Sequence, residues 1–206
     1  MNSRHPDVRI ERLVGADIAP HLEALARLRI EVFREYPYLY EGTLASEQRY
    51  LHQFAQSPRS TLVLARHLHD GVVLGAATAM PLLDHGDVAQ LASPFQGAGY
   101  EFERVCYFGE SVLTRAQRGR GIGNAFFDQR EASAREQGFS IAAFCAVQRP
   151  DDHPLRPANY VPHDVFWTRR GYTRRPDMVA HFSWPDVGQV EQTNKPMVTW
   201  LKELRA

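Results

Sequence analysis

The chain has 206 residues, 44% of them hydrophobic, which suits one packed domain over residues 1–206. Lys+Arg and Asp+Glu both number 24, so the formal net charge is zero. No overall positive field therefore favours nucleic acid or an acidic bilayer as a partner. No apolar run approaches a membrane span of roughly 18 residues, and no N-terminal apolar segment precedes a small-residue cleavage site. We expect a cytoplasmic protein with no nucleic-acid and no membrane partner.

The first half of the chain is expected to alternate strands and helices. Apolar and charged residues alternate in the opening segment, helical spacing follows, and two β-rich runs are separated by a short polar turn. The expected elements are a strand at 8–13, a helix from Pro20 to before Pro37, a helix at about 44–54, and a hairpin of 60–67 with 72–80. Residues 82–101 are interpreted as an insertion, in which Pro94, Gly97 and Gly99 break a possible short helix.

The second half predicts a strand, turn, helix, strand unit followed by closing strands. Its apolar runs are continuous, as in buried parallel strands, and Gly138 marks the end of the helix. The expected elements are a strand at 104–113, a helix ending near 137, a strand at 141–147, a proline-rich loop at 149–162, a helical turn at 164–170, and strands at 178–184 and 196–201.

Two groups that resemble reactive or metal sites have simpler interpretations. Cys106 and Cys145 lie in apolar runs, where a free thiol usually packs as a small hydrophobe; a disulfide or a nucleophile is the alternative. Asp151, Asp152 and His153 form a possible metal site, but adjacent carboxylates in a proline-rich loop are more often solvated or capping. We therefore expect no metal.

A glycine-rich turn between a predicted strand and a predicted helix carries the clearest signal. It reads Arg118, Gly119, Arg120, Gly121, Ile122, Gly123, Asn124. The first amides of a helix lack partners within it, the helix dipole attracts anions, and glycine allows close approach of phosphate oxygens. The two arginines add charge-assisted contacts. The alternative is a strand-to-helix turn that needs glycines only for its geometry.

The residues absent from this turn narrow the choice of anion. A Walker-type loop needs a lysine and a hydroxyl residue after its last glycine, and neither follows Gly123. The dinucleotide motif needs a third glycine, where Asn124 stands, and an acidic residue after the next strand, which ends at Val147 and Gln148. The pattern thus disfavours both a nucleoside triphosphatase and a Rossmann site.

The turn and its context resemble the GNAT-type N-acetyltransferase family, whose signature is [Q/R]xxGx[G/A] at the start of a helix after a bulged strand. Arg118, Gly121 and Gly123 match it, 109–113 precedes it like the family's fourth strand, and 166–172 resembles its later helix-to-strand segment. The resemblance implies an α/β fold with a mixed, mostly antiparallel central sheet and helices on both faces. The family's fourth and fifth strands are parallel and splayed.

The same resemblance implies acetyl-CoA as co-substrate, held between those two strands. Its pyrophosphate would bind the amides of 118–124, and its pantetheine would follow the edge formed by Val112, Leu113 and Thr114. In the family a backbone N–H of this strand points at the thioester carbonyl, and the amide of Val112 is the expected oxyanion donor.

Attack by a neutral amine on a thioester requires removal of a proton, directly or through water. Glu110, two residues before Val112, is the candidate base, because the family often has an acidic residue there. The alternative is a half-exposed strand residue or an ion-pair partner of a nearby arginine. Glu101 and Glu103 are weaker candidates.

The family often places a tyrosine on the later helix to protonate the leaving thiolate, but here that position is Trp167, which has no acidic proton to give. Trp167 is kept as a cofactor contact. Tyr160 in the preceding loop, or water, replaces the acid. Asn159 corresponds to the family's asparagine that contacts pantetheine, with a spacing one residue longer than usual.

The aromatic turn containing Tyr36, Tyr38 and Tyr40 is expected to line the acceptor site, because the loop between the family's first two helices overhangs it. The expected function is acetyl transfer from acetyl-CoA to a small-molecule amine or a protein lysine. The alternative is a non-catalytic acyl-CoA binding or sensing module. The oligomeric state is left open, with a homodimer as one option because the exposed strand edges of such folds often pair.

Overall fold

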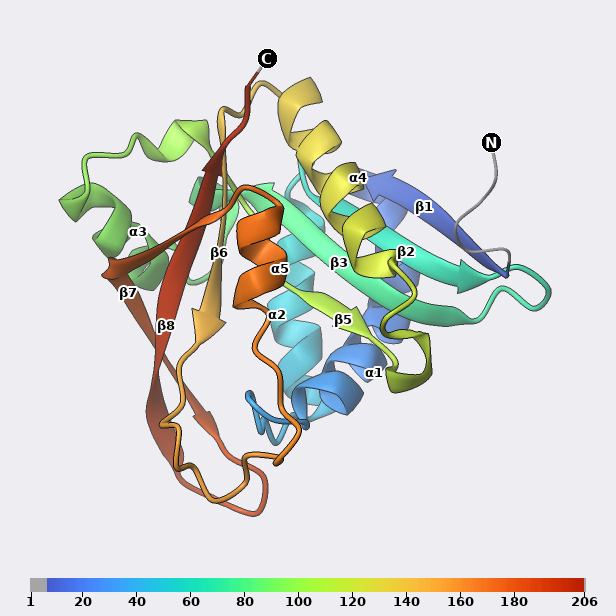
Figure 1. The fold of residues 1–206 in the computed structure, drawn as a ribbon. Helices are drawn as coiled ribbons and strands as arrows, with labels where there is room; N and C mark the ends of the chain where they lie inside the picture. Colours follow the sequence, from blue (N-terminus) through green and yellow to red (C-terminus); the bar gives the residue numbers. More distant parts are fainter. Residues whose placement is uncertain (1–6, 206) are drawn as a thin grey trace.

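The computed structural model describes residues 7–205 and shows an eight-stranded mixed sheet with helices on both faces (Figure 1). The strands are β1 (Val8–Val14), β2 (Thr61–His67), β3 (Val73–Pro81), β4 (Val105–Tyr107), β5 (Ser111–Leu113), β6 (Ile141–Val147), β7 (Thr173–Pro185) and β8 (Gln192–Glu203). Their order is β1-β2-β3-β4-β6-β8-β7, and β5 pairs with β3. Within the described residues only β4 and β6 pair in parallel, so the expected fold class is confirmed.

The helices are α1 (Leu22–Phe33), α2 (Leu44–Gln56), α3 (Val88–Gly97), α4 (Ile122–Glu136) and α5 (Asp164–Arg169). Alternation along β2 shows how they are divided between the faces. Leu62 and Leu64 pack with α1 and α2, whereas Val63 and Ala65 pack with α4. Helix α3 covers the first face further along the sheet, and α5 lies beside α4 on the second (Figure 1). None of the helices in 7–205 is long and apolar enough to cross a membrane.

Within the 82–101 insertion, Pro94 was expected to break a short helix. That prediction was wrong, because α3 continues through Pro94 to Gly97. A proline inside a helix removes one backbone hydrogen bond. Leu91 and Phe95 flank it and are completely buried against the sheet. Burial of two such side chains offsets the loss of one bond, since each contributes roughly 1.5–3 kcal/mol.

The strand predicted at 104–113 is divided into two short strands. β4 pairs with β6, and the last bond of this pairing runs from Phe108 N to Ala143 O at 2.7 Å. β5 pairs with β3 instead, with Ala76 opposite Val112. We call the space between β5 and β6 the fork, because the chain leaves one neighbour at Phe108 and stays with the other.

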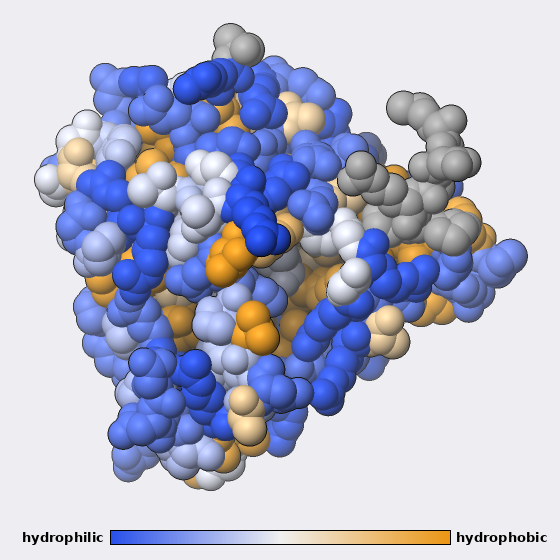
Figure 2. All heavy atoms as spheres, in the orientation of Figure 1, coloured by the Kyte–Doolittle hydropathy of each residue, from blue (hydrophilic) through white to orange (hydrophobic). Residues whose placement is uncertain are grey.

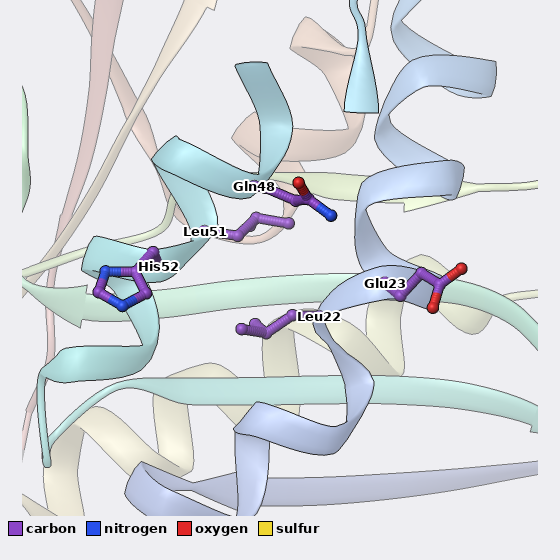
Figure 3. Close-up of a pocket in the computed structure, with 5 residues that line it drawn as sticks. All are labelled: Leu22, Glu23, Gln48, Leu51 and His52. Carbon is purple, nitrogen blue, oxygen red and sulfur yellow. The ribbon is translucent and has the colours of Figure 1, made fainter. Parts of the chain in front are cut away.

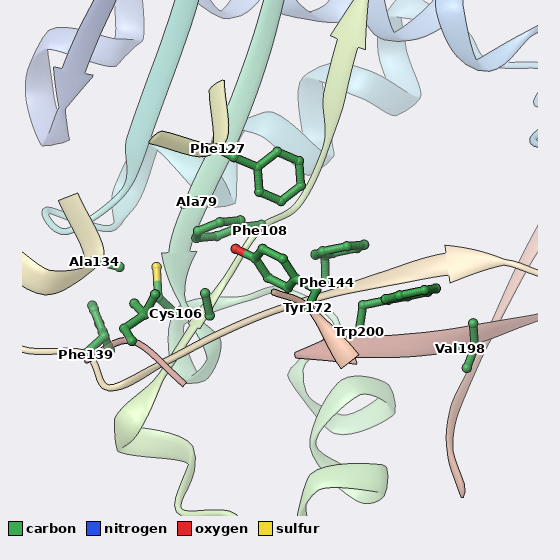
Figure 4. Packing of buried hydrophobic residues seen from close by; sticks show 12 residues of the cluster. Ala79, Cys106, Phe108, Phe127, Ala134, Phe139, Phe144, Tyr172, Val198 and Trp200 are labelled. Atoms are coloured by element: carbon green, nitrogen blue, oxygen red, sulfur yellow. The ribbon is translucent and has the colours of Figure 1, made fainter. Parts of the chain in front are cut away.

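An aromatic cluster anchors α4 over the point where the strand divides. The ring of Phe127 on α4 lies 6.1 Å from Phe108, 5.8 Å from Phe144 and 5.2 Å from Tyr172, measured between centroids. Figure 4 shows these rings gathered between the helix and the strands. The N-terminus of α4 is therefore held in a fixed position beside the fork.

We predict that Gly75→Ala lowers the thermal midpoint. A Cβ at Gly75 in β3 would lie 2.5 Å from Leu113 Cδ1 and 2.9 Å from Val112 O, so β5 would have to move. Overpacking of this kind destabilises by about 1–3 kcal/mol, or several degrees for a chain of this size. Gly97→Ala is the control, because nothing lies within 4 Å of its added Cβ. Equal midpoints for the two variants in thermal melts would contradict the prediction.

Candidate active site

The fork exposes one edge of β5. Thr78 N donates to Glu110 O at 3.1 Å, and Thr114 N donates to Leu74 O at 3.0 Å. In an antiparallel ladder these bonds alternate along the strand. The backbone groups of residues 110, 112 and 114 therefore face β3, and those of 111 and 113 face the fork.

This alternation corrects the choice of Val112 as oxyanion donor. The Val112 N–H lies in the β3–β5 ladder, and the carbonyl of the same residue is close to Gly75 of β3. The N–H groups that face the fork belong to Ser111 and Leu113, and neither has a partner within 7–205. Ser111 is also exposed, as expected where no second strand covers the edge.

The glycine-rich turn forms the other wall of the site. Gly119 and Gly121 have φ angles of 75° and 87°, a region that disfavours residues with a Cβ, and Gly121 is the N-cap of α4. The backbone N–H groups of 119–123 donate to no acceptor among the described residues. The outer amides differ, because Arg118 N donates to Arg115 O and Asn124 N to Gly121 O. The run of free amides is thus one residue shorter at each end than predicted.

Both arginines of the turn are engaged in ion pairs at its surface. Arg118 donates to both carboxylate oxygens of Glu35, at 2.8 and 2.9 Å, and to Leu113 O at 3.2 Å. Arg120 donates to Asp7 at 2.7 Å. Exposed pairs of this kind contribute only about 0–1 kcal/mol, so an anion at the turn competes easily for either guanidinium.

On the opposite face of the sheet, Glu110 belongs to a buried charged cluster. Its carboxylate is paired with Arg29 of α1, which also pairs with Glu47 of α2, and both carboxylate side chains are 1% exposed. The hydroxyl of Tyr50 lies 3.4 Å from Glu110 Oε2. Glu110 Oε1 is buried and has no hydrogen-bond partner in the described part of the chain. Two carboxylates around one guanidinium leave this cluster one negative charge in excess.

The pKa of Arg29 reflects this arrangement. Burial alone would lower the pKa, but Glu110, Tyr50 and Glu47 together raise it above its usual value. Arg29 therefore stays charged and holds both carboxylates in place. The sequence held a signal for it, since Arg29 stands among the apolar positions of its helix beside Leu25, Leu28 and Val32.

His85 adjoins this cluster through Tyr50, with the two ring centroids 5.9 Å apart. Its Nδ1 accepts from Asp87 N at 3.1 Å, which places the proton on Nε2, 3.5 Å from the Tyr50 hydroxyl. Burial, followed by the charge of Arg29, lowers the pKa of His85 to about 4. His85 is neutral at physiological pH, and sequence reasoning did not single it out.

Comparison with known proteins now identifies the family. A model of the Acetyltransferase (GNAT) family matches residues 23–157, more than half of the chain. The chain belongs to the GNAT acetyltransferase family. The enzymes of this family transfer acyl groups from acyl-CoA, and the resemblance found in the sequence is confirmed. No curated protein sequence matches the chain significantly.

Solved structures confirm the GNAT fold at low sequence identity. A ribosomal-protein-alanine N-acetyltransferase from Brucella melitensis gives a TM-score of 0.59 at 14% identity, covering 95% of this chain and 99% of that chain. An N-acetyltransferase from Staphylococcus aureus Mu50 gives 0.57 at 9% identity, covering 96% and 99%. A GCN5-related N-acetyltransferase from Kribbella flavida gives 0.54 at 17% identity, covering 95% and 98%.

Among the remaining candidates the structure brings Tyr36 and Tyr160 together, with ring centroids 4.7 Å apart. Burial, with a smaller contribution from Tyr36, raises the pKa of Tyr160. Tyr38 instead packs between Phe33 and Trp184, and the Tyr40 hydroxyl lies 3.2 Å from Ser46 Oγ. Of the three tyrosines in the loop between α1 and α2, Tyr36 is the one placed beside the candidate acid.

Trp167 and Asn159 occupy contrasting environments in this GNAT fold. The indole of Trp167 packs 5.1 Å from Trp200 and 5.0 Å from Phe144, so its ring belongs to the aromatic core. Asn159 is exposed in the loop before α5.

In the space-filling view, apolar surface shows in a recess between α5 and β5, rimmed by hydrophilic side chains (Figure 2).

The loop between α1 and α2 is fixed by a residue that the sequence did not single out. Arg149, just after β6, donates to Pro37 O at 2.9 Å and Tyr38 O at 2.8 Å. It also forms a two-pronged ion pair with Asp186, at 2.9 and 2.7 Å. Because Arg149 directly follows β6, these bonds hold the loop between α1 and α2 at a set distance from the fork.

The outer surface of α1 and α2 carries a shallow groove of about 260 Å³. Figure 3 shows the side chains that line it, which come from the start of α1 and the middle of α2: Leu22, Glu23, Gln48, Leu51 and His52. The glycine-rich turn lies across the sheet on the α4 face, so the groove is separate from the site. The described residues also contain no cluster of three or more His, Cys, Asp or Glu side chains placed to hold a metal.

We predict that His85 makes the free energy of unfolding fall as the pH drops from about 6.5 to about 4. The folded-state pKa lies near 4 and the unfolded value near 6.5, so the unfolded chain binds more protons in this window. The effect reaches roughly 3 kcal/mol at its acid end. In His85→Gln this component disappears and the pH dependence becomes shallower. Urea unfolding at several pH values measures the free energy of unfolding, with His52→Gln at an exposed position as the control. The same pH dependence in wild type, His85→Gln and His52→Gln would refute the prediction.

Proposed function

We propose that this GNAT enzyme transfers an acetyl group from acetyl-CoA to a primary amine by direct attack on the thioester. One observation carries the proposal: five successive free amides, at residues 119–123, cap α4 beside a strand whose 111 and 113 amides are also free. The first set suits the pyrophosphate, and the second suits the amide-bearing pantetheine arm.

The residues present fit acetyl-CoA in this position. Gly119 lies in open space, so phosphate oxygens reach the backbone without meeting a side chain. Arg118 lies next to Leu113 and exchanges Glu35 for a phosphate when the co-substrate binds. Pantetheine then follows the open edge of β5, where the Leu113 N–H faces the fork; Thr114, also expected at this edge, is bonded to Leu74 of β3 instead. The thioester carbonyl accepts from the Ser111 N–H, which stabilises the developing oxyanion.

The acceptor approaches from the face covered by α1 and α2. Glu110 Oε1, buried and without a hydrogen-bond partner in 7–205, accepts the proton of the ammonium group, directly or through water. The amine nitrogen then forms a bond to the acetyl carbon, the C–S bond breaks, and the nitrogen releases its second proton to water. The thiolate takes a proton from Tyr160 or from water. The excess negative charge of the Arg29 cluster favours a cationic acceptor, either a small amine or a protein lysine.

A second function is a non-catalytic acyl-CoA binding module, and the ion pair of Glu110 with Arg29 favours it. Glu110 Oε2, the oxygen that pairs with Arg29, is already engaged and is not available to an acceptor. The free amides of 119–123 serve both functions equally, so binding and turnover must be measured separately.

We expect excess acetyl-CoA to raise the thermal midpoint of the protein. A ligand at about 100 times its Kd stabilises the native state by roughly 2.7 kcal/mol, which corresponds to about 5–10 °C here. Gly121→Glu abolishes the shift, because a carboxylate occupies the place of the pyrophosphate. Gly138→Glu, at the other end of α4, is the matched control, since it adds the same charge at a similar φ of 83°. An unchanged midpoint for wild type at millimolar acetyl-CoA would sink the proposal.

We expect Glu110→Gln to lower kcat by about 10²–10⁴, the usual contribution of a general base, and to leave acetyl-CoA binding intact. Glu47→Gln is the control, because it also removes one carboxylate from Arg29 but leaves Glu110 in place. Steady-state kinetics in an amine screen measure both variants. Equal losses would show that the cluster is structural, and binding without turnover in wild type would favour the binding module.

A further inference from the structure

Arg130 of α4 is a buried charged residue that forms no ion pair with a carboxylate of residues 7–205. Its side chain is among the largest that are completely buried, with 1% exposure. The guanidinium carbon lies 4.4 Å from the centre of the Phe108 ring and 4.7 Å from that of Phe127. Burial lowers the pKa of Arg130 to about 10, which leaves the group charged at neutral pH. A buried charge is costly unless its hydrogen bonds are satisfied, so its partners show what it does.

Those partners are concentrated at the fork. Nη1 donates to Glu110 O at 3.1 Å and to Thr78 O at 3.2 Å, and Nη2 donates to Ser111 Oγ at 2.8 Å. Nε completes the set with a bond to Phe126 O on its own helix, at 3.3 Å. The guanidinium of Arg130 therefore forms hydrogen bonds to both Glu110 and Ser111, the two residues joined by this peptide bond.

This peptide carries the Ser111 N–H, one of the two N–H groups that face the fork. In a trans peptide the C=O and N–H point in opposite directions. The Glu110 C=O accepts from Arg130 and from Thr78 N on the β3 side, so the Ser111 N–H points away from β3. A hydrogen bond from a charged donor to the carbonyl also polarises the amide and strengthens the N–H as a donor.

We propose that Arg130 is a positioning residue, which fixes and polarises the Glu110–Ser111 peptide so that its N–H is aimed at the thioester carbonyl. The inference rests on the proposed function. It assigns a role in the reaction to a residue that does not itself contact the substrate. It also explains why α4 carries both elements: its N-terminus binds the pyrophosphate, and two turns later its arginine orients the oxyanion donor.

The test measures the carbonyl itself. Acetyl-CoA labelled with ¹³C at the acetyl carbonyl is bound to each protein, and isotope-edited infrared spectra report the C=O stretch. In wild type the stretch lies below that of free acetyl-CoA, because the carbonyl accepts a hydrogen bond. In Arg130→Met it returns toward the free value. In the same variant we expect kcat to fall by about 10–100-fold, less than loss of a whole oxyanion donor, while acetyl-CoA affinity changes less than about threefold.

Two further variants separate orientation from stability. Glu131→Gln disturbs a buried ion-pair network on the next residue of α4, with Lys202 and Arg170, and does not touch the fork. We expect it to keep the wild-type stretch. Arg130→Lys retains the charge but reaches only part of the partner set, so its stretch should be intermediate; it also replaces Arg130→Met should that variant not fold.

The carbonyl stretch and acetyl-CoA binding together distinguish failure of the inference from failure of the proposed function. A lowered stretch in wild type that is unchanged in Arg130→Met and Arg130→Lys overturns the inference, as does an equal change in Glu131→Gln. Bound acetyl-CoA with no lowering in wild type also overturns it but leaves the proposed function standing. Absence of acetyl-CoA binding by wild type removes both.

Discussion

The site depends on one constraint, which is that a single segment of backbone cannot pair with two diverging neighbours. Up to Phe108 the chain bonds to β6, and from Glu110 onward it bonds only to β3. The N–H groups of Ser111 and Leu113, which would have faced β6, have no partner within 7–205. Backbone amides in such a position need a partner, and a ligand that carries amides and a carbonyl of its own supplies one, much as an added strand does. The fork is thus an incomplete sheet, and under the proposed function the co-substrate takes the place of the missing strand.

Two buried arginines stabilise the fork from opposite faces by different chemistry. Arg29 lies on the α1 and α2 side and is neutralised by Glu47 and Glu110. Arg130 lies on the α4 side and is satisfied by carbonyls, a hydroxyl and two aromatic rings. Removing a partner from either arginine would leave an uncompensated charge in the apolar core, which is strongly unfavourable. The geometry around Glu110 and Ser111 is therefore rigid although the strand on one side is absent.

Local patterns in the sequence predicted much of this architecture. The apolar run of β6 was predicted with its observed bounds, 141–147, and the glycine turn with its place between strand and helix. What failed depends on contacts between distant segments. The choice of Val112 over Ser111 is a shift of one residue, which reverses every backbone direction and is set by pairing with β3. Arg130 stands in a stretch, DQREASARE, that has the composition of an exposed helix, and only the packing of α4 over Phe108 buries it.

The distribution of charge within the fork matters more than the charge of the whole protein. The formal net charge is zero, so no long-range field draws in either an anionic co-substrate or a cationic acceptor. At physiological ionic strength charges are screened beyond about 8 Å, and selection must occur inside the site. There the α4 face offers free amides, a helix N-terminus and Arg118, while the α1 and α2 face offers two carboxylates around one guanidinium. The sheet separates these opposite environments by its own thickness, and under the proposed function the thioester and the amine meet at the fork.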